Sequence, residues 1–287
     1  MFNMNWNKKI ETKNFDQKQT FPKPKVIVEK VLGKPMPVGP VKKVETLSQP
    51  IEEPKRKISK ELYGKIERRN MAILRFILDQ KYISKEQLKR RFFSWANEKG
   101  NLFTESAVKR FLAEEWVSEK PGTGKHPALL IVTDKGLEKL TQMSQSEKRS
   151  AIMTKRIFEP EVAHDLILND VRISMENKKM VSLWFSEKRL EAEPKMRSLF
   201  KDMPDAVVYS ASKRGSFLEF ENAPKGPGKY KERIEELTKA LSDPEIINQG
   251  IDEIVFVCRE SSSFLMLEKL IQNVKNVRLM KLTEVLG

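Results

Sequence analysis

Carboxylates, lysines and a tyrosine follow one another closely in one short stretch of the chain, and together these residue types could act on a phosphodiester. The stretch contains Asp205, Glu219, Glu221, Lys225, Lys229 and Tyr230. Carboxylate oxygens bind hard divalent cations such as Mg²⁺ or Mn²⁺, and a nearby lysine can stabilise the negative charge that develops during hydrolysis or transfer. The stretch therefore predicts a site that holds a divalent cation against a phosphodiester.

Two β-favouring runs, residues 205–209 and 217–221, are expected to position these side chains as a pair of strands. Glu219 and Glu221 are two residues apart, so they point to the same face of their strand. Strand pairing would bring Asp205 beside them, and the turn rich in glycine and proline that follows would place the lysines nearby. The alternative interpretation is a hairpin with a polar solvent face and an ordinary basic loop.

Composition favours a polyanionic partner. The chain has 287 residues, 39% of them hydrophobic, which is enough for two compact domains and a tail. It carries 54 Lys and Arg against 40 Asp and Glu, a formal net charge of +14. Nucleic acid is the leading candidate, although ribosomal and membrane-surface proteins share such a balance.

The rarer residue types restrict the location of the protein and its metal chemistry. Cys258, the one cysteine of the chain, cannot form an internal disulfide, so a reducing cytoplasm fits best, and its apolar surroundings predict a core residue. The sequence offers neither the roughly 20 apolar residues of a membrane span nor a signal-peptide core, so no membrane insertion is expected. With only His126 and His164 beside that cysteine, the composition argues against structural zinc.

Residues 1–60 are predicted to form a disordered basic tail, because prolines and lysines dominate there and few large apolar side chains separate them. Such an arm could add nonspecific attraction to phosphate or engage a partner protein. It could equally be a solvated leader, and composition does not choose between these interpretations.

Residues 61–145 show the pattern of a winged helix. Apolar periodicity predicts helices at about 62–78, 84–93 and 104–112, the second opened by a capping box of Ser84 and Gln87. Two strands around a basic, glycine-rich loop and a further helix from Asp134 follow. Helix, helix, helix and hairpin is the order of this DNA-binding module.

The expected DNA contacts are basic residues on the second and third helices and on the wing. They are Lys89, Arg90, Arg91, Lys109, Arg110, Lys120 and Lys125. A winged helix places its third helix in the major groove and its wing against the backbone. Alternatively the module binds protein and the basic cluster of the second helix is a solvated face, while His126 on the wing is expected at the surface.

Residues 158–287, which follow a polar connection, predict an α/β domain with a mixed sheet. Its elements are a helix at 160–178, strands at 181–187, 205–209 and 217–221, a helix at 230–241, a strand at 254–258, a helix at 264–274 and a strand at 277–282. The final alternation implies parallel crossovers. His164 is either a half-buried or a catalytic histidine, and Glu187 is either a further metal-site acid or the first residue outside the sheet.

This order, together with Pro204-Asp205 and Glu219-x-Glu221, resembles the PD-(D/E)xK restriction-endonuclease-like superfamily. More closely, the chain from about residue 60 to its end resembles the MobC-type plasmid relaxases and the related replication-relaxation family. That resemblance depends on the winged helix, on Glu-Phe-Glu-x-x-x-Lys-x-x-x-Lys-Tyr from Glu219, on His164-Asp165 and on Trp-Phe-Ser-Glu ending at Glu187.

The resemblance implies nicking of one DNA strand at the transfer origin of a plasmid or mobile element, with Mg²⁺ or Mn²⁺ as cofactor. Double-stranded and single-stranded DNA would be the substrates, and an accessory DNA-binding protein and a coupling ATPase would be partners. Asp205, Glu219 and Glu187 would be metal ligands, with His164 at a further catalytic position.

One position departs from the superfamily pattern. Glu221 stands where the superfamily has its lysine, so Lys225, or else Lys229, would supply the positive charge. Either water or Tyr230 would be the nucleophile. Two other functions compete with the relaxase: a noncatalytic replication or transcription regulator with a degenerate nuclease fold, and a restriction-type endonuclease that cuts both strands.

Overall fold

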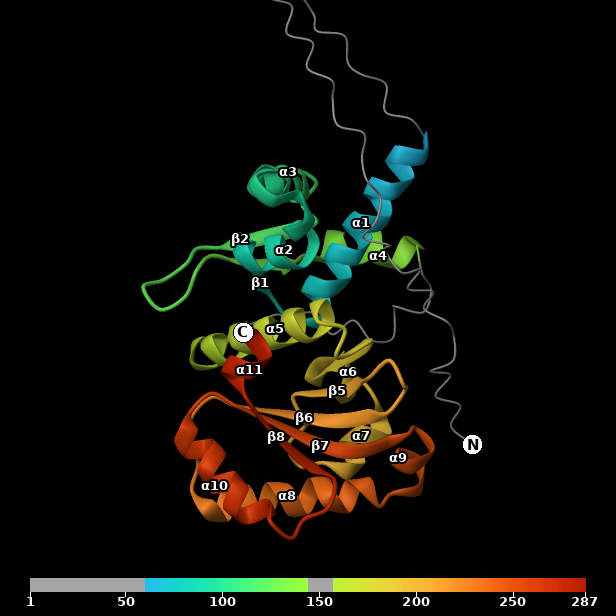
Figure 1. Cartoon of the computed structure of the whole chain (residues 1–287). Helices are drawn as coiled ribbons and strands as arrows, with labels where there is room; N and C mark the ends of the chain where they lie inside the picture. Colours follow the sequence, from blue (N-terminus) through green and yellow to red (C-terminus); the bar gives the residue numbers. More distant parts are fainter. Residues whose placement is uncertain (1–59, 144–156) are drawn as a thin grey trace, which may run out of the picture. The chain divides into compact units, whose positions relative to one another are not determined.

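The computed structural model describes residues 60–143 and 157–287 (Figure 1). The chain divides into two units, Met1–Ser59 and Lys60–Gly287, and the described residues all belong to the second. The predicted disordered tail and most of the predicted connection between the domains lie outside the described residues. We refer to residues 60–143 as the N-terminal module and to residues 157–287 as the C-terminal module.

The N-terminal module combines four α-helices with a small antiparallel sheet in the described residues. Its elements are α1 (Lys60–Asp79), β1 (Ile83–Ser84), α2 (Lys85–Phe92), the 3₁₀ helix η1 (Ser94–Lys99), α3 (Gly100–Ala113), β2 (Val117–Lys120), β3 (Leu129–Val132) and α4 (Asp134–Met143). The strand order is β1-β3-β2. The predicted helices and the two long strands are present, and β1 is an addition.

Local sequence signals explain where these elements begin. The predicted capping box is confirmed, because Ser84 Oγ accepts a hydrogen bond from the Gln87 amide and Gln87 Oε1 accepts one from the Ser84 amide, both at 3.2 Å. Burial of the apolar stripes then holds α1, α2 and α3 together. The stripes contribute Ile73, Leu74, Ile77, Leu88, Val108 and Phe111 to one core.

The C-terminal module is built on a five-stranded mixed sheet, as predicted. Its elements are α5 (Glu159–Asn177), β4 (Leu183–Ser186), α6 (Glu187–Glu191), α7 (Pro194–Leu199), β5 (Ala206–Tyr209), β6 (Gly215–Glu221), α8 (Pro227–Leu241), α9 (Pro244–Asn248), β7 (Ile251–Cys258), α10 (Ser261–Ile271), β8 (Val277–Lys281) and α11 (Leu282–Leu286). The strand order is β4-β5-β6-β7-β8. β4, β5 and β6 pair antiparallel, whereas β6, β7 and β8 pair parallel.

Helices cover both faces of this sheet (Figure 1): α5 and α11 lie on one side, and α8 and α10 lie on the other. Leu218 and Phe220 of β6 pack in one cluster with Leu168 and Val171 of α5. Because side chains alternate along a strand, Glu219 and Glu221 point toward α8. β6 is buried along its whole length, so the alternative of a hairpin with a polar solvent face is wrong.

The two modules share packing and polar contacts. Ile173 of α5 belongs to the core of the N-terminal module, and Tyr82 packs with Val162 of α5. Asn169 Nδ2 donates to the Tyr82 carbonyl at 2.9 Å, and Gln87 Nε2 donates to the Leu166 carbonyl at 2.6 Å. Helix α5, which belongs to the C-terminal module, therefore also packs against the N-terminal module.

None of the helices that the structure describes combines the length and the apolar character that crossing a bilayer requires.

Candidate functional site

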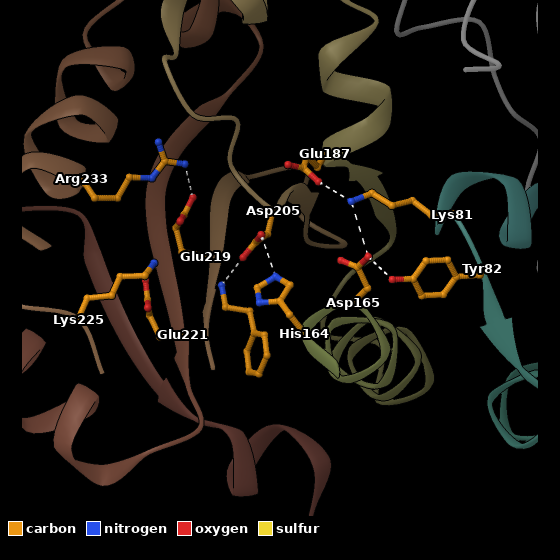
Figure 2. A network of polar contacts seen from close by, with 11 residues as sticks. Lys81, Tyr82, His164, Asp165, Glu187, Asp205, Glu219, Glu221, Lys225 and Arg233 are labelled. Atoms are coloured by element: carbon orange, nitrogen blue, oxygen red, sulfur yellow. Dashed lines mark hydrogen bonds and ion pairs between the residues drawn. The ribbon is translucent and has the colours of Figure 1, made fainter. Parts of the chain in front are cut away.

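Asp205 lies directly before β5 and completes the pairing of that strand with β6. The register sets Ala206 opposite Leu218, and beyond that pair Asp205 Oδ2 accepts a hydrogen bond from the Phe220 amide at 2.6 Å. Phe220 is the residue between Glu219 and Glu221, so the Asp205 carboxylate lies beside both acids of β6 (Figure 2). The predicted gathering of these three acids is confirmed.

His164 of α5 faces the same carboxylate. Its Nε2 lies 3.2 Å from Asp205 Oδ1, and its ring lies 5.2 Å from the Phe220 ring. Burial acts to lower the pKa of His164, but the hydrogen bond and the charge of Asp205 outweigh it and raise the pKa. The predicted helix therefore brings His164 to the acids that the sequence singled out.

Glu219 is buried and paired with Arg233 of α8. Arg233 Nη2 donates to Glu219 Oε1 at 2.6 Å, while its Nη1 donates to Glu236 and to the Asp202 carbonyl. Burial, together with the neighbouring carboxylates of Asp205 and Glu221, raises the pKa of Glu219 to about 8, although the guanidinium opposes this rise. The charged form of Glu219 therefore depends on the guanidinium of Arg233 for its stabilisation.

Arg233 was not among the predicted site residues, although the sequence contains a signal for it. Tyr230, Ile234 and Leu237 form the buried stripe of α8. A residue three positions after Tyr230 and four before Leu237 belongs to the same stripe. A basic residue on a buried stripe requires an acidic partner, and the neighbouring strand carries two acids.

Glu221 is 1% exposed and pairs with Lys225, whose Nζ lies 3.0 Å from Glu221 Oε1. Burial raises the pKa of Glu221. Within the described part of the chain, Glu221 Oε2 is buried without a hydrogen-bond partner. The expectation that Lys225 lies beside these carboxylates is confirmed.

The other two predicted residues of this stretch lie on α8. Tyr230 is buried, and its hydroxyl accepts a hydrogen bond from the Lys225 amide at 3.2 Å. Lys229 is exposed in the first turn of the helix, not in the loop before it. The loop prediction was wrong because Pro227 begins the helix, a position where its fixed φ is favourable.

Glu187 belongs to a second group of polar side chains, in which Lys81 of the N-terminal module is central. Lys81 Nζ lies 3.0 Å from Glu187 Oε2 and 3.7 Å from Asp165 Oδ2, and the Tyr82 hydroxyl donates to Asp165 Oδ2 at 2.6 Å (Figure 2). One small cavity of about 20 Å³ is bordered by Lys81, Asp165, Glu187 and Asp205. Glu187 follows β4 as the first residue of α6.

The donor set suits a hard divalent cation in chemistry, since Asp205, Glu219 and Glu221 offer carboxylate oxygens. The unpartnered Glu221 Oε2 among the described residues is one such oxygen. Within residues 60–143 and 157–287, however, no three His, Cys, Asp or Glu side chains are close enough to share one ion. Metal binding would therefore require Arg233 or Lys225 to release its carboxylate.

The predicted DNA-binding residues fall into three groups. Arg90 pairs with Asp170 and Arg91 with Glu176, both at 2.6 Å, and Lys120 pairs with Glu159 at 3.0 Å, so these three face α5. Arg110 lies over the Trp116 ring and 3.9 Å from Glu67, and Lys89 is half-buried. Lys109 on α3 and Lys125 in the loop between β2 and β3 are exposed.

The expectation that His126 lies at the surface was wrong. The residue is buried, and its Nε2 lies 2.9 Å from Glu159 Oε2 while its Nδ1 lies 2.7 Å from the Pro127 carbonyl. The contact with Glu159 connects the loop between β2 and β3 to α5. Local sequence cannot reveal this partner, because it lies 33 positions away.

Comparison with protein-family models, with curated proteins and with solved structures finds no match for this chain.

Proposed function

We propose that the protein is a metal-dependent DNA endonuclease of relaxase type, which nicks one strand at the transfer origin of a plasmid or mobile element. In this proposal the N-terminal module is a winged helix that binds duplex DNA, and the C-terminal module has a restriction-endonuclease-like fold. Helix α5, the antiparallel strands β4 to β6, helix α8 and the parallel strand β7 support it, because they follow in the order on which the resemblance depends.

The observation that carries the proposal is the position of Asp205. Its carboxylate accepts from the amide between Glu219 and Glu221, so three acids from two strands meet at one end of the antiparallel pair. A purely structural sheet has no need of three clustered carboxylates, two of them buried, because like charges there repel one another. A divalent cation would relieve that repulsion.

In the proposed reaction Asp205 and Glu219 would hold Mg²⁺ or Mn²⁺, with Glu221 beside them. When bound, the cation would polarise the phosphodiester and lower the pKa of an attacking water. Lys225 offers an ammonium group at the same end of β6 to stabilise developing charge. His164 would hold the Asp205 carboxylate in place through its Nε2.

Relaxation of supercoiled plasmid carrying the cognate origin tests this function, with Mn²⁺ or Mg²⁺ present. We expect Asp205→Asn and Glu219→Gln to lose nicking by about 10²-fold or more, as for other groups that stabilise a transition state. Asparagine is preferred at Asp205 because its amide oxygen can still accept from Phe220.

Asp252→Asn is the matched control, because Asp252 is an exposed acid that pairs with Arg214 at the start of β7. It should nick as the wild type does. Folded Asp205 and Glu219 variants that nick at the wild-type rate would show that the metal-site assignment is wrong. Linear product instead of relaxed circles would identify a restriction-type enzyme.

A second function, a noncatalytic DNA-binding regulator, is favoured by one observation. Arg233 and Lys225 already neutralise Glu219 and Glu221 from within the chain. A regulator with a degenerate nuclease fold would keep these pairs permanently. Thermal unfolding with Mn²⁺ separates the two: a metal-binding site raises the melting temperature by mass action, whereas a degenerate site leaves it unchanged and the DNA intact.

A further inference from the structure

We propose that Lys81, from the turn between α1 and β1, contacts a phosphate of the bound DNA at the candidate site and supplies, together with Lys225, the positive charge that Glu221 displaces from β6. The inference rests on the proposed function, because it assigns one more residue to the same site. It places a residue of the N-terminal module in the chemistry of the C-terminal one.

The surroundings of Lys81 combine the groups that phosphodiester chemistry uses. Its Nζ lies between two carboxylates, 3.0 Å from Glu187 and 3.7 Å from Asp165. The cavity that they border also includes Asp205, the acid that carries the proposed function. The superfamily pattern has a lysine where this chain has Glu221. The ammonium group of Lys81 beside carboxylates would return a positive charge to the site.

Two residues that line the same cavity carry an unpartnered polar atom. Gln80 and Ser186 are more than nine-tenths buried, and neither Gln80 Nε2 nor Ser186 Oγ has a hydrogen-bond partner among the described residues. An amide nitrogen only donates, and a hydroxyl also can donate. A phosphate oxygen or a water that bridges to it would satisfy both groups, and the cavity of about 20 Å³ holds about one water.

The backbone holds Lys81 in place at a conformational cost. Its φ is +66°, in the left-handed region that residues other than glycine rarely adopt. The next residue, Tyr82, fixes the turn, because its hydroxyl bonds Asp165 and its carbonyl accepts from Asn169. Figure 2 shows Lys81 Nζ directed between Glu187 and Asp165, two of the residues that line the cavity.

Arg233 and Lys225, the basic partners of the two acids of β6, do not line this cavity. Arg233 is 13% exposed, and three separate oxygens hold its guanidinium, whereas Lys81 is 28% exposed. Lys225 is 48% exposed, but its Nζ pairs with Glu221. Burial alone would lower the pKa of Lys81, but Asp165 and Glu187 raise it, so its ammonium stays charged.

The test compares Lys81→Met, Lys81→Arg and a control, Lys85→Met. Lys85 pairs with Glu119 at 3.0 Å, the distance of the Lys81 pair with Glu187, but lies away from the cavity. The first measurement is the salt dependence of duplex affinity. Loss of one phosphate contact lowers the slope of log Kd against log salt by about 1, so Lys81→Met should show this drop while the arginine and control variants do not.

The second measurement is nicking of supercoiled plasmid with Mn²⁺. Lys81→Met should slow it by about 10²-fold, and Lys81→Arg should restore most of the rate. An unchanged slope with Lys81→Met overturns the inference, including when that variant melts earlier, because a structural lysine alters stability without removing a phosphate contact. Wild-type protein that shows the Lys81-dependent slope but never nicks overturns the nuclease proposal and leaves the phosphate contact standing.

Discussion

Each acid of the candidate site has a different basic partner: His164 for Asp205, Arg233 for Glu219 and Lys225 for Glu221. The spacing of two residues was enough to predict that the two glutamates share a face, because that period is fixed by strand geometry. The basic partners come from three other segments. Lys225, four residues along the chain, was predicted beside the acids, and His164 was a candidate, whereas the pairing of Arg233 with Glu219 was missed.

The contact of His164 with Asp205 makes stability depend on pH. The folded protein holds the His164 proton above the unfolded pKa of about 6.5. Above that pH the folded state holds more protons than the unfolded state, so the free energy of unfolding falls as pH rises. The stabilisation is complete below pH of about 6.5 and is lost as pH rises through the folded pKa.

Denaturant unfolding of wild type and His164→Asn across pH 5 to 9 measures this effect as a difference between two curves. Glu219 also has a raised pKa, and its contribution falls over the same window, but it is common to both proteins. The difference should shrink as pH rises. A difference that stays constant with pH would mean that the His164 proton adds nothing to the contact.

At the scale of helices and strands, long periodic segments were predictable and short ones were not. The helices α1, α3, α5 and α8 and the strands β4 to β8 lie close to their predicted ranges. The helices α6, α7, α9 and α11 have five or six residues. A segment that short completes fewer than two turns, so its hydrophobic period cannot be distinguished from chance.

Close packing at the start of α4 gives a prediction about one glycine. A Cβ at Gly136 would lie 2.1 Å from the Trp116 carbonyl oxygen, next to β2, and backbone cannot yield as a side chain can. Gly136→Ala should therefore destabilise the protein by about 1–3 kcal/mol, the usual cost of overpacking.

Gly124→Ala in the loop between β2 and β3 is the matched change, because a Cβ there meets no atom within 4 Å. It should alter stability by less than about 0.5 kcal/mol, as exposed substitutions do. Urea titration of both variants measures the difference. Equal midpoints would show that β2 and α4 separate without cost.

For the molecule as a whole, the sequence predicted two domains but not how closely they share α5. Contacts such as Arg90 with Asp170 or Lys81 with Glu187 join residues 80 and 106 positions apart. Local periodicity carries no information about such pairs, since each residue alone is also consistent with a solvated face. Arg90 and Arg91 were predicted to contact DNA, and nothing in the sequence indicated that each of them pairs with an acid of α5.

The rate at which Cys258 reacts with a thiol reagent reports how often the sheet of the protein opens. Cys258 is the one cysteine in the chain, it is 1% exposed, and β7 sets it directly beside Glu221. Burial raises the pKa of its thiol to about 12, and only a thiolate attacks a labelling reagent. Modification must therefore wait until the sheet opens at the candidate site.

The rate at which a thiol reagent labels the native protein thus measures the free energy of that opening, with no engineered probe. We expect labelling to be several orders of magnitude slower than in urea-unfolded protein, because the opening is rare. Mn²⁺ should slow it further if the carboxylates beside Cys258 bind the ion. Native labelling as fast as that of the unfolded chain would contradict the buried position of the thiol.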